Sequence, residues 1–450
     1  MSVWKLVNLL IRFALSCALG TLPLLVLPVN AANRPNIIII VADDLGYADL
    51  GCQGATDVRT PFIDSIATNG VRFTDGYVSC PVCSPTRAGL MTGKYQQRFG
   101  HELNPPPPAQ AGNVGLSLKE TTLADRLKTA GYVTGMFGKW HLGLAEIYNP
   151  TRRGFDEYFG FLHGRHDYLD WEGDPFNPVV RGTKRMKGKD YLTDAFSQEA
   201  VSFIKSHQKE PFFIYLPYNA VHSPLEAPKH YLQRFSEVRD VKRRTYLAML
   251  SAMDDGVGAV LRTLRETGLE TNTLVIFFSD NGGPTQETTS RNKPLSGGKG
   301  SVRDGGIRTP AMLQWTGTIP AGKIYSQPVI QLDYHVTALA AAGVLTKNST
   351  NLDGVDLLPF LAGKKTSAPH QYLYWRYNKQ WAIRSGSYKL AQFPNGSPKL
   401  FDLSNDIAES KDLIVAKPDV ATRLQREWNE WSNQMVPPAW SRSGSKKEND

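Results

Sequence analysis

Apolar runs alternate along the chain with segments of amphipathic spacing. Four runs have the composition of buried strands: residues 36–44, 131–143, 211–224 and 273–283. Three segments between these runs place apolar residues at roughly helical spacing: residues 122–130, 193–206 and 245–267. Strands that alternate with helices in this way predict an α/β fold, in which helices cover both faces of a sheet.

Each of the four predicted strands ends in charged, amide or imidazole side chains. In chain order these side chains belong to Asp43 and Asp44, Lys139 and His141, His222, and Asp280 and Asn281. Ligands of open α/β sheets bind beyond the carboxyl ends of the strands. The sequence therefore predicts that these ends form one shared site.

The pattern changes near residue 366. Segments 372–377, 380–393 and 399–403 have the alternation of antiparallel strands, with turn signals at Ser385-Gly386 and Asn395-Gly396. A helix is predicted near 419–434. A chain of 450 residues, 41% of them hydrophobic, is long enough for a large core with a smaller appended unit. We therefore expect a main domain over 33–365 and a C-terminal antiparallel subdomain, with a terminal helix and tail, over 366–450.

The first 32 residues have the pattern of a secretory signal peptide. Lys5 and Arg12 precede an apolar stretch over 13–27, and Ala31 ends a small-residue cleavage site. The stretch is too short and too interrupted by proline to make a good membrane anchor. We therefore expect a secreted or periplasmic protein without a membrane anchor.

The chain is basic, with 51 Lys and Arg residues against 42 Asp and Glu residues and a formal charge of +9. Removal of the signal peptide lowers this charge by two. The positive residues are scattered and form no long blocks, which is typical of a solvated basic surface; attraction to polyanions is the alternative. We predict no nucleic-acid partner.

Three cysteines remain once the signal peptide is removed: Cys52, Cys80 and Cys83. An odd number of cysteines in an exported protein leaves one thiol without a partner. If Cys52 and Cys80 form a disulfide, Cys83 is the remaining thiol.

The acidic pair at 43–44 and the acid-amide pair at 280–281 offer only oxygen ligands. Hard cations such as Ca²⁺ and Mg²⁺ prefer oxygen, whereas Zn²⁺ usually takes histidine or thiolate ligands. A single Asp-Asp pair is more often part of a capped turn. Two pairs at the ends of strands instead favour a metal site formed by Asp43, Asp44, Asp280 and Asn281.

Cys83 stands at the predicted start of a short helix. Ser84 is expected as its N-cap, and Pro85 suits the first turn. Backbone N–H groups at such a helix start favour an anion. Arg87, one turn further on, projects its guanidinium group toward the same place. A tetrahedral oxyanion would fit this pocket.

Four further residues add charge or proton-transfer chemistry to the predicted pocket. Lys139 follows a strand, and Lys299 lies in a glycine-rich loop that can bring its ammonium group close. His141 and His222 are candidate acid and base groups. A lone histidine or a lone glycine-rich loop is more often structural. A catalytic role for these residues is therefore indicated only by their occurrence together.

The residues around Cys83 resemble the signature of the type I sulfatases, which belong to the alkaline-phosphatase superfamily. Residues 83–87 match the pattern Cys-x-Pro-x-Arg, with Thr86 in place of the commoner serine, and "LMTG" follows at 90–93. Further blocks are similar to family blocks in the same order: "GKWHLG" at 138–143, "SDNGG" at 279–283 and "NKPLSGGKGSVRDGGIRTP" at 292–310. The resemblance covers nearly the whole mature chain and implies a secreted carbohydrate sulfatase.

The resemblance also implies a fold and a set of cofactors. The fold is a large mixed β-sheet flanked by helices, followed by a smaller C-terminal subdomain with four antiparallel strands. A formylglycine-generating maturation enzyme would oxidise Cys83 to Cα-formylglycine, an aldehyde whose hydrate attacks the sulfur of a sulfate ester. The metal would be Ca²⁺, held by Asp43, Asp44, Asp280 and Asn281.

The family implies a role for each remaining catalytic position. Lys139, Lys299 and His222 would bind the sulfate oxygens, and His222 or Lys299 would protonate the leaving oxygen. Asp280 would help to deprotonate the nucleophile and Arg87 would orient it. His141 would accept a proton as sulfate leaves and the aldehyde returns.

The expected substrate is a sulfated polysaccharide or oligosaccharide, either a carrageenan-type galactan or a glycosaminoglycan. His166 and Asp167 follow a block that lies on the substrate side in the family, and we expect them to contact substrate.

Two rival functions are weighed against the sulfatase. The first is a formylglycine-dependent phosphonate monoester hydrolase or phosphodiesterase, which would be expected to prefer a transition-metal site; the Asp280-Asn281 pair lacks histidine. The second is an inactive protein that binds sulfated glycans. The filled catalytic positions argue against it.

Overall fold

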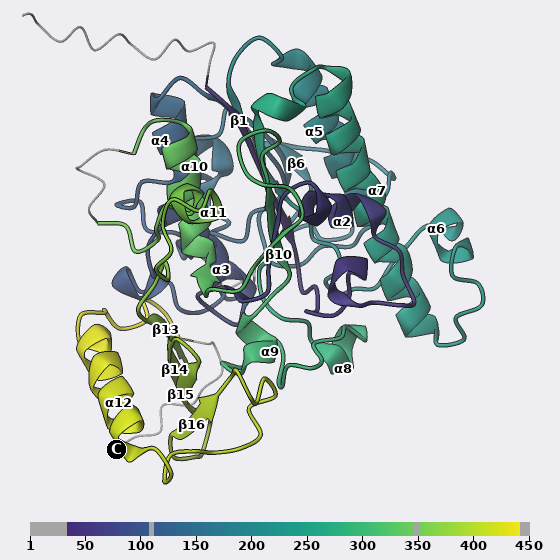
Figure 1. Cartoon of the computed structure of the whole chain (residues 1–450). Helices are drawn as coiled ribbons and strands as arrows, with labels where there is room; N and C mark the ends of the chain where they lie inside the picture. Colours follow the sequence, from purple (N-terminus) through teal and green to yellow (C-terminus); the bar gives the residue numbers. More distant parts are fainter. Residues whose placement is uncertain (1–33, 108–111, 346–350, 442–450) are drawn as a thin grey trace, which may run out of the picture.

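The computed structural model describes residues 34–107, 112–345 and 351–441 (Figure 1). The predicted signal peptide at 1–32 lies outside the described residues. Ten strands form one large sheet: β1 (Asn36–Ala42), β2 (Val71–Phe73), β4 (Val133–Lys139), β5 (Glu157–Phe161), β6 (Val180–Arg181), β7 (Lys184–Arg185), β8 (Phe212–Pro217), β9 (Thr273–Ser279), β10 (Ala311–Gln314) and β11 (Lys323–Tyr325).

The sheet is mixed, with strand order β11-β2-β10-β9-β1-β8-β4-β5-β6-β7. Strand β1 pairs in parallel with β8 on one side and β9 on the other, whereas β10 runs antiparallel to β9. The carboxyl ends of β4, β8, β1 and β9 therefore lie in order along one edge. This arrangement confirms the predicted α/β fold.

Strand β1 is apolar throughout because both of its faces are covered. Ile38 and Ile40 belong to the core on one face of the sheet, and Ile37, Ile39 and Val41 belong to the core on the other. Alternate residues of a strand point to opposite faces, so two covered faces require a continuous apolar run.

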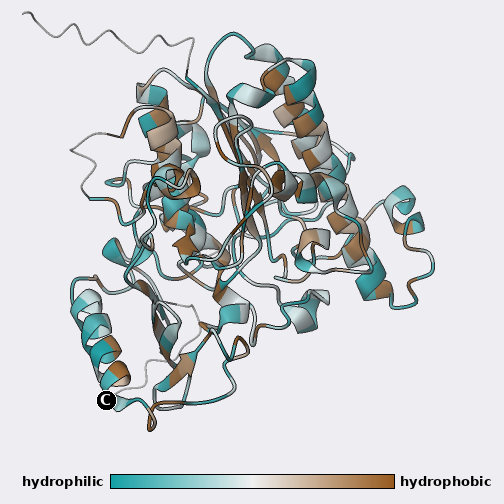
Figure 2. Cartoon of the chain, viewed as in Figure 1, coloured by the Kyte–Doolittle hydropathy of each residue, from teal (hydrophilic) through white to brown (hydrophobic). Residues whose placement is uncertain are grey.

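Helices form a layer on each face of the sheet (Figure 1). One layer contains α2 (Pro61–Thr68), α5 (Leu192–Ser206) and α7 (Val241–Glu266). The other contains α3 (Cys83–Thr92), α4 (Leu123–Thr129) and α10 (Gln331–Ala341). Apolar side chains of both layers pack toward the sheet, and Figure 2 shows hydrophilic stretches on the outer helices.

Helix α7 begins earlier than the predicted Thr245. Asp240 precedes the helix, and its Oδ1 accepts hydrogen bonds from the backbone N–H of Lys242 at 2.9 Å and of Arg243 at 3.2 Å. A capped start of this kind satisfies N–H groups that have no partner within the helix. The apolar spacing used for the prediction begins only after this polar first turn.

The C-terminal region forms the predicted antiparallel sheet of four strands. Helix α12 (Pro418–Ser432) packs against this sheet through a small apolar cluster that includes Leu390 and Leu424. The strands are β13 (Leu373–Tyr377), β14 (Gln380–Ser385), β15 (Tyr388–Gln392) and β16 (Lys399–Asp402).

Several shorter strands and α-helices occur in addition to these main elements. They lie in connections between the main strands and helices, and α8 and α9 border the loop that carries Lys299. The elements are β3 (Gly76–Tyr77), β12 (Val329–Ile330), α6 (Lys229–Gln233), α8 (Thr285–Thr288), α9 (Asp304–Ile307) and α11 (Leu358–Leu361).

The disulfide between Cys52 and Cys80, which the sequence left open, is not formed. Both residues are free thiols, as is Cys83. Cys80 is buried in a core cluster that also contains Trp375, whereas Cys52 packs against the cluster on the α2, α5 and α7 side of the sheet. The two thiols therefore belong to different parts of the core.

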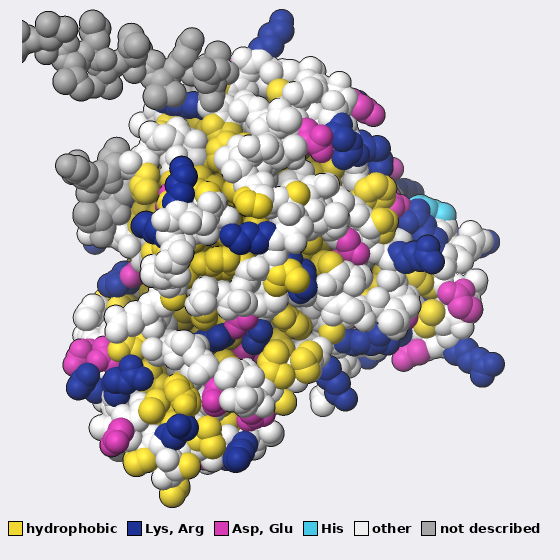
Figure 3. Space-filling view, in the orientation of Figure 1, with side chains coloured by type: hydrophobic (Ala, Val, Ile, Leu, Met, Phe, Trp, Pro, Cys, Tyr) yellow, Lys and Arg dark blue, Asp and Glu magenta, His cyan; other side chains and the backbone are white. Residues whose placement is uncertain are grey.

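The basic residues are dispersed over the surface. On the face shown in Figure 3, Lys and Arg side chains lie singly or in small groups among acidic and uncharged ones. Among the described residues, no helix combines the length and the apolar character needed to cross a bilayer.

Candidate active site

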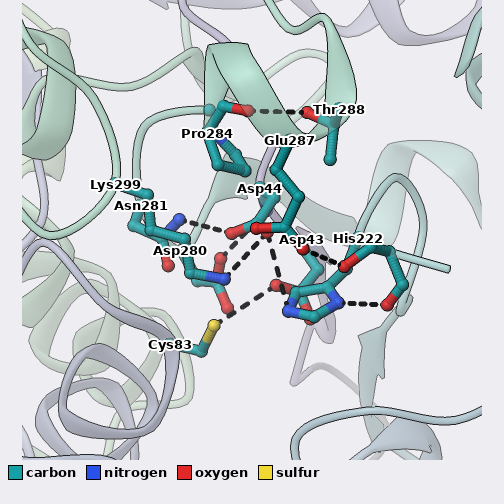
Figure 4. Close-up of polar contacts among 12 residues, drawn as sticks. Asp43, Asp44, Cys83, His222, Asp280, Asn281, Pro284, Glu287, Thr288 and Lys299 are labelled. Atoms are coloured by element: carbon teal, nitrogen blue, oxygen red, sulfur yellow. Dashed lines mark hydrogen bonds and ion pairs between the residues drawn. The ribbon is translucent and has the colours of Figure 1, made fainter. Parts of the chain in front are cut away.

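The polar strand ends converge at one edge of the main sheet (Figure 4). Asp43 and Asp44 follow β1, and Asp280 and Asn281 follow β9, its parallel neighbour. His222 comes from the loop after β8, the parallel neighbour on the other side. The register of the sheet thus brings together residues that are far apart in the sequence.

Cys83 is the first residue of α3 and is buried, with 1% of its surface exposed. Its Sγ lies 3.4 Å from Oδ1 of Asp43. The extended residue Val82 occupies the N-cap position, so the expectation that Ser84 caps this helix is wrong. The Ser84 hydroxyl instead donates to the carbonyl oxygen of His141 at 2.6 Å, which ties the helix start to the end of β4.

Arg87 joins the two acidic strand ends beneath Cys83. Its Nε and Nη2 donate to Oδ2 of Asp280 at 2.9 and 2.7 Å, and Nη2 lies 3.3 Å from Oδ2 of Asp43. Nη1 donates to the carbonyl oxygen of Lys139 at 2.9 Å. The guanidinium group is enclosed, so its charge acts on both carboxylates with little screening by water.

Two lysines and a histidine surround the carboxylates of residues 43 and 44. Lys139 forms a buried ion pair with Asp43. Lys299 Nζ lies 2.8 Å from Oδ2 of Asp44, and His222 Nε2 lies 3.6 Å from the same oxygen. Burial opposes the charged form of Lys299, but the Asp44 carboxylate outweighs it and raises the lysine pKa.

The oxygen donors fit a hard divalent cation. One ligand atom from each of Asp43, Asp44, Cys83 and His222 falls within 4.8 Å of the others; this group contains two of the predicted oxygen ligands, and Asp280 is not part of it. Asn281 Nδ2 donates to Oδ1 of Asp44 at 2.7 Å, while its buried Oδ1 has no hydrogen-bond partner among the described residues. A buried acceptor without a donor is costly unless a cation or water satisfies it. Carboxylate and amide oxygens are the ligands that Ca²⁺ prefers.

Burial and neighbouring charge shift the pKa values of these groups in different directions. Burial, reinforced by Asp43, raises the pKa of Asp280 to about 6. Burial opposes ionisation of Asp43 too, but the surrounding positive charges, led by Lys139, hold its pKa well below the ordinary value. Burial and the Asp43 charge raise the pKa of the Cys83 thiol. An unmodified Cys83 is therefore a neutral thiol and a poor nucleophile.

His141 lies beside this cluster in a left-handed backbone conformation, with φ of 59°. Burial and the Lys139 charge lower its pKa well below the ordinary value, so the imidazole is neutral. Its Nδ1 is buried with no hydrogen-bond partner among the described residues. A Cβ atom at Gly164 would lie 2.4 Å from the His141 ring, so this glycine makes room for the histidine.

The two predicted substrate contacts lie in the loop after β5. His166 is enclosed, with 3% of its surface exposed, and its ring packs against Phe161. Its Nδ1 lies 2.7 Å from the carbonyl oxygen of Asp167. The adjacent Tyr168 hydroxyl donates to the carbonyl oxygen of His222 at 2.8 Å, which links this loop to the cluster. Direct substrate contact by His166 and Asp167 remains a prediction.

Several residues of the site carry no motif that could have identified them. His101 Nε2 lies 2.7 Å from the Ser84 hydroxyl, and Asn104 Oδ1 accepts from the Ser84 backbone N–H at 3.0 Å. Glu287 accepts a hydrogen bond from the Ser223 hydroxyl, next to His222. Gln380, from the C-terminal sheet, contacts the backbone beside Lys299. These residues are separated in the sequence from the groups they support.

Comparison with known proteins agrees with this geometry. Residues 35–344 match the sulfatase family model, and residues 298–434 match the model for the C-terminal part of N-sulphoglucosamine sulphohydrolase. N-acetylgalactosamine-6-sulfatase of Canis lupus familiaris is 34% identical over 385 residues, which cover 80% of this chain and 72% of that protein. Arylsulfatase A of Bos taurus is 33% identical over 468 residues, with coverage of 90% and 88%.

Solved structures of sulfatases also resemble this chain. The structure of Ps i-CgsB in complex with k-i-k-neocarrahexaose has a TM-score of 0.87 and 37% identity, and the match covers 91% of this chain and 95% of that one. A phosphonate monoester hydrolase of Agrobacterium radiobacter, at 20% identity and a TM-score of 0.66, shares the fold. The family model matches more than half of the chain, and the relatives are at least 33% identical over most of its length. Because the site geometry agrees with these matches, the chain belongs to the sulfatase family and is a sulfuric ester hydrolase.

Proposed function

We propose that this sulfatase removes sulfate from a sulfated glycan, with a Cα-formylglycine made from Cys83 and a Ca²⁺ ion in its active site. The observation that carries the proposal is the position of Cys83. It stands at a helix start, 3.4 Å from Asp43, and the carboxylates of Asp43 and Asp44 are paired with three enclosed cations, those of Arg87, Lys139 and Lys299. Similar proteins named for carrageenan and for N-acetylgalactosamine 6-sulfate chemistry support a carbohydrate substrate.

Each cofactor would supply one kind of chemistry. Formylglycine provides, as its hydrate, the hydroxyl nucleophile that a neutral cysteine cannot provide, and Ca²⁺ provides positive charge for the sulfate oxygens. Asp43, Asp44, Asp280 and Asn281 would hold the Ca²⁺ ion. Formation of the formylglycine requires a maturation enzyme as a partner, and we propose export of the chain through its N-terminal segment.

The cations of the site bind the sulfate group. Lys299 and His222 both reach Oδ2 of Asp44, and Lys139 reaches the neighbouring Asp43, so all three lie around one small volume. Fixed positive groups in an enclosed site stabilise the charge that develops on the ester during cleavage. Lys299 is the most exposed of the three, which suits contact with the leaving oxygen at the mouth.

His141 is the group that holds a proton after the ester bond is cleaved. The imidazole is neutral and buried, and its Nδ1 has no partner among the described residues. A neutral imidazole can accept a proton, and the nearby Lys139 charge favours its later release. Arg87 fixes the base of the site by binding Asp43 and Asp280 together.

The test measures both the modification of Cys83 and the hydrolysis of sulfate esters. The protein is co-expressed with a formylglycine-generating enzyme, and the peptide that carries Cys83 is analysed by mass spectrometry alongside sulfate release from a panel of sulfated glycans. We expect an aldehyde at residue 83 and sulfate release that the Cys83→Ala variant loses. The Cys52→Ala variant, which changes a cysteine outside the site, should retain activity.

Two outcomes would favour the rival functions. Faster turnover of an aryl phosphonate monoester than of an aryl sulfate would indicate a phosphonate monoester hydrolase. An unmodified thiol, under conditions that convert a control sulfatase, would indicate an inactive protein that binds sulfated glycans. His166 and Asp167, proposed as substrate contacts, can be tested by alanine substitution in the same glycan panel.

A further inference from the structure

A cavity of about 440 Å³ opens beside the active site. It is lined by the segment 283–287, whose last three residues belong to α8, and by the glycine-rich segment 297–299. Lys299 belongs to this lining and also contacts Asp44, so the cavity adjoins the catalytic cluster (Figure 4). Its volume lies within the range of small-ligand sites, about 300–1,000 Å³. The cavity is therefore suited to hold the sugar that carries the sulfate.

Among the described residues that line this cavity, Glu287 has the only carboxylate. Glu287 is exposed, and it accepts a hydrogen bond from the Ser223 hydroxyl. The carbonyl oxygen of Ser223 lies 2.5 Å from Nδ1 of His222. Glu287 therefore contacts the residue next to His222, the histidine proposed to bind the sulfate group.

The charge of Glu287 is not neutralised by a neighbouring cation. No ion pair of Glu287 within 4 Å occurs in the described part of the chain, and the one cation in the cavity lining, Lys299, pairs with Asp44. A carboxylate accepts strong hydrogen bonds from hydroxyl groups. The same carboxylate repels any anionic group that the sugar carries in addition to the scissile sulfate. Glu287 would therefore weaken the binding of sugars with a carboxylate or a second sulfate group.

From this arrangement we infer that Glu287 selects a neutral sugar at this position. The ring that carries the scissile sulfate offers hydroxyl donors to Glu287 and bears neither a carboxylate nor a second sulfate group. This inference rests on the proposed function and narrows its substrate class. A galactan whose sulfated ring carries a single sulfate group therefore fits the cavity better than a glycan whose sulfated ring is itself a uronate.

The alternative is a purely structural role, in which Glu287 only holds the Ser223-His222 segment. Removal of the Ser223 hydroxyl breaks that link and leaves the carboxylate in the cavity. The Ser223→Ala variant therefore separates the two roles, because it should not change the preference between neutral and acidic sugars.

Binding is measured by calorimetry in the Cys83→Ala background, with Ca²⁺ present, so that the result does not depend on maturation or turnover. The ligands are two oligosaccharides of equal length, a galactan whose sulfated ring carries one sulfate group and a glycan whose sulfated ring is a uronate. We expect tighter binding of the galactan ligand. Addition of Glu287→Gln should weaken that binding about tenfold, because a charge-assisted hydrogen bond is lost.

The same substitution should strengthen binding of the uronate ligand by about threefold, because a repulsive charge is removed. Glu237→Gln, which changes a glutamate outside this cavity, serves as the control and should leave both affinities unchanged. An unchanged ratio of the two affinities after Glu287→Gln, or an equal effect of Ser223→Ala, would overturn the role of Glu287. Absence of binding by either ligand to any of these proteins would instead remove the proposed function itself.

Discussion

Gln380 donates a hydrogen bond from its side-chain Nε2 to the carbonyl oxygen of Gly300 at 2.7 Å. Its Oε1 accepts a second bond from the backbone N–H of Val302 at 3.2 Å. On the opposite side, the Gly300 N–H donates to the carbonyl oxygen of Pro81, close to Cys83. The C-terminal sheet therefore holds the Lys299 loop against the start of the Cys83 helix.

Gln380→Ala should weaken catalysis without direct contact with substrate. Two hydrogen bonds are lost, each worth about 0.5–1.5 kcal/mol, and the buried backbone N–H of Val302 loses its partner. We expect kcat/KM to fall about tenfold, with the larger change in kcat, because Lys299 is less well positioned to stabilise the charge that develops during cleavage. Gln392→Ala, which removes a side-chain bond to Trp381 within the same sheet, is the matched control. Equal losses in both variants would indicate a general weakening of the subdomain.

Ca²⁺ should stabilise the folded protein, and Asn281 should contribute to this effect. Binding to the native state alone adds about 2.7 kcal/mol of stability when the ion concentration is about 100 times its Kd. We expect the melting temperature to rise with added Ca²⁺, and to rise less at the same concentration in Asn281→Ala, which lacks the free buried oxygen. Differential scanning fluorimetry measures both shifts. The exposed Asn433→Ala variant should respond as the wild type does, and an undiminished response of Asn281→Ala would contradict the assignment.

Gly164→Ala should lower turnover by displacing His141. The added Cβ would lie 2.4 Å from Cε1 and 2.5 Å from Nε2 of that ring, so the ring must move. Loss of a positioned proton-transfer group reduces rates by on the order of 10² or more, so we expect a fall in kcat with little change in KM. Steady-state kinetics on an aryl sulfate provides the measurement. Gly396→Ala, whose Cβ would meet no atom closer than 3.8 Å, is the control.

Asp254 should make stability depend on pH. Burial raises its pKa to about 7, although its carboxylate accepts backbone N–H bonds from Phe62 and Ile63 at the start of α2. Between about pH 4 and pH 7 the native state keeps a proton that the unfolded chain has released, so stability falls as the pH rises through this interval. A pKa difference of about three units between the native and the unfolded state changes the free energy of unfolding by up to about 4 kcal/mol across this interval.

Asp254→Asn removes this titration while it keeps an oxygen acceptor for the helix. The free energy of unfolding, measured with urea at pH 5 and pH 8, should therefore fall less with rising pH in the variant than in the wild type. The exposed Asp419→Asn variant should retain the wild-type dependence. Identical pH profiles for Asp254→Asn and the wild type would show that this carboxylate does not titrate in the interval.

The prediction of the main sheet succeeded because burial leaves a local pattern. Ile37 to Val41 are apolar without interruption since both faces of β1 are covered, and that pattern needs no knowledge of the partner strands. The acidic pairs at residues 43–44 and 280–281 could be placed at a common edge because parallel strands end on the same side. Cys83 and Arg87 were identifiable because a short motif holds both on one helical turn.

Other features depended on contacts between distant segments, which carry no local signal. Gln380 lies 80 residues from Gly300, and its sequence context is that of an ordinary strand. Ser84 has the composition of a helix cap, yet the helix begins one residue earlier and its hydroxyl serves the backbone of His141. The free thiols of Cys52 and Cys80 lie in different core clusters, a separation that only the packing of the layers determines.

The sequence by itself therefore determined which residues could form a sulfatase site and on which kind of element each one lies. The tertiary structure decided how those residues are held, because hydrogen bonds and ion pairs across the sheet edge, the Lys299 loop and the C-terminal sheet depend on side-chain geometry. It also decided that a carboxylate, Glu287, faces the cavity beside Lys299. The spacing of apolar residues in the sequence predicts which residues are buried. Only the packing of the folded chain brings two charged side chains that are distant in the sequence close enough to contact the same ligand.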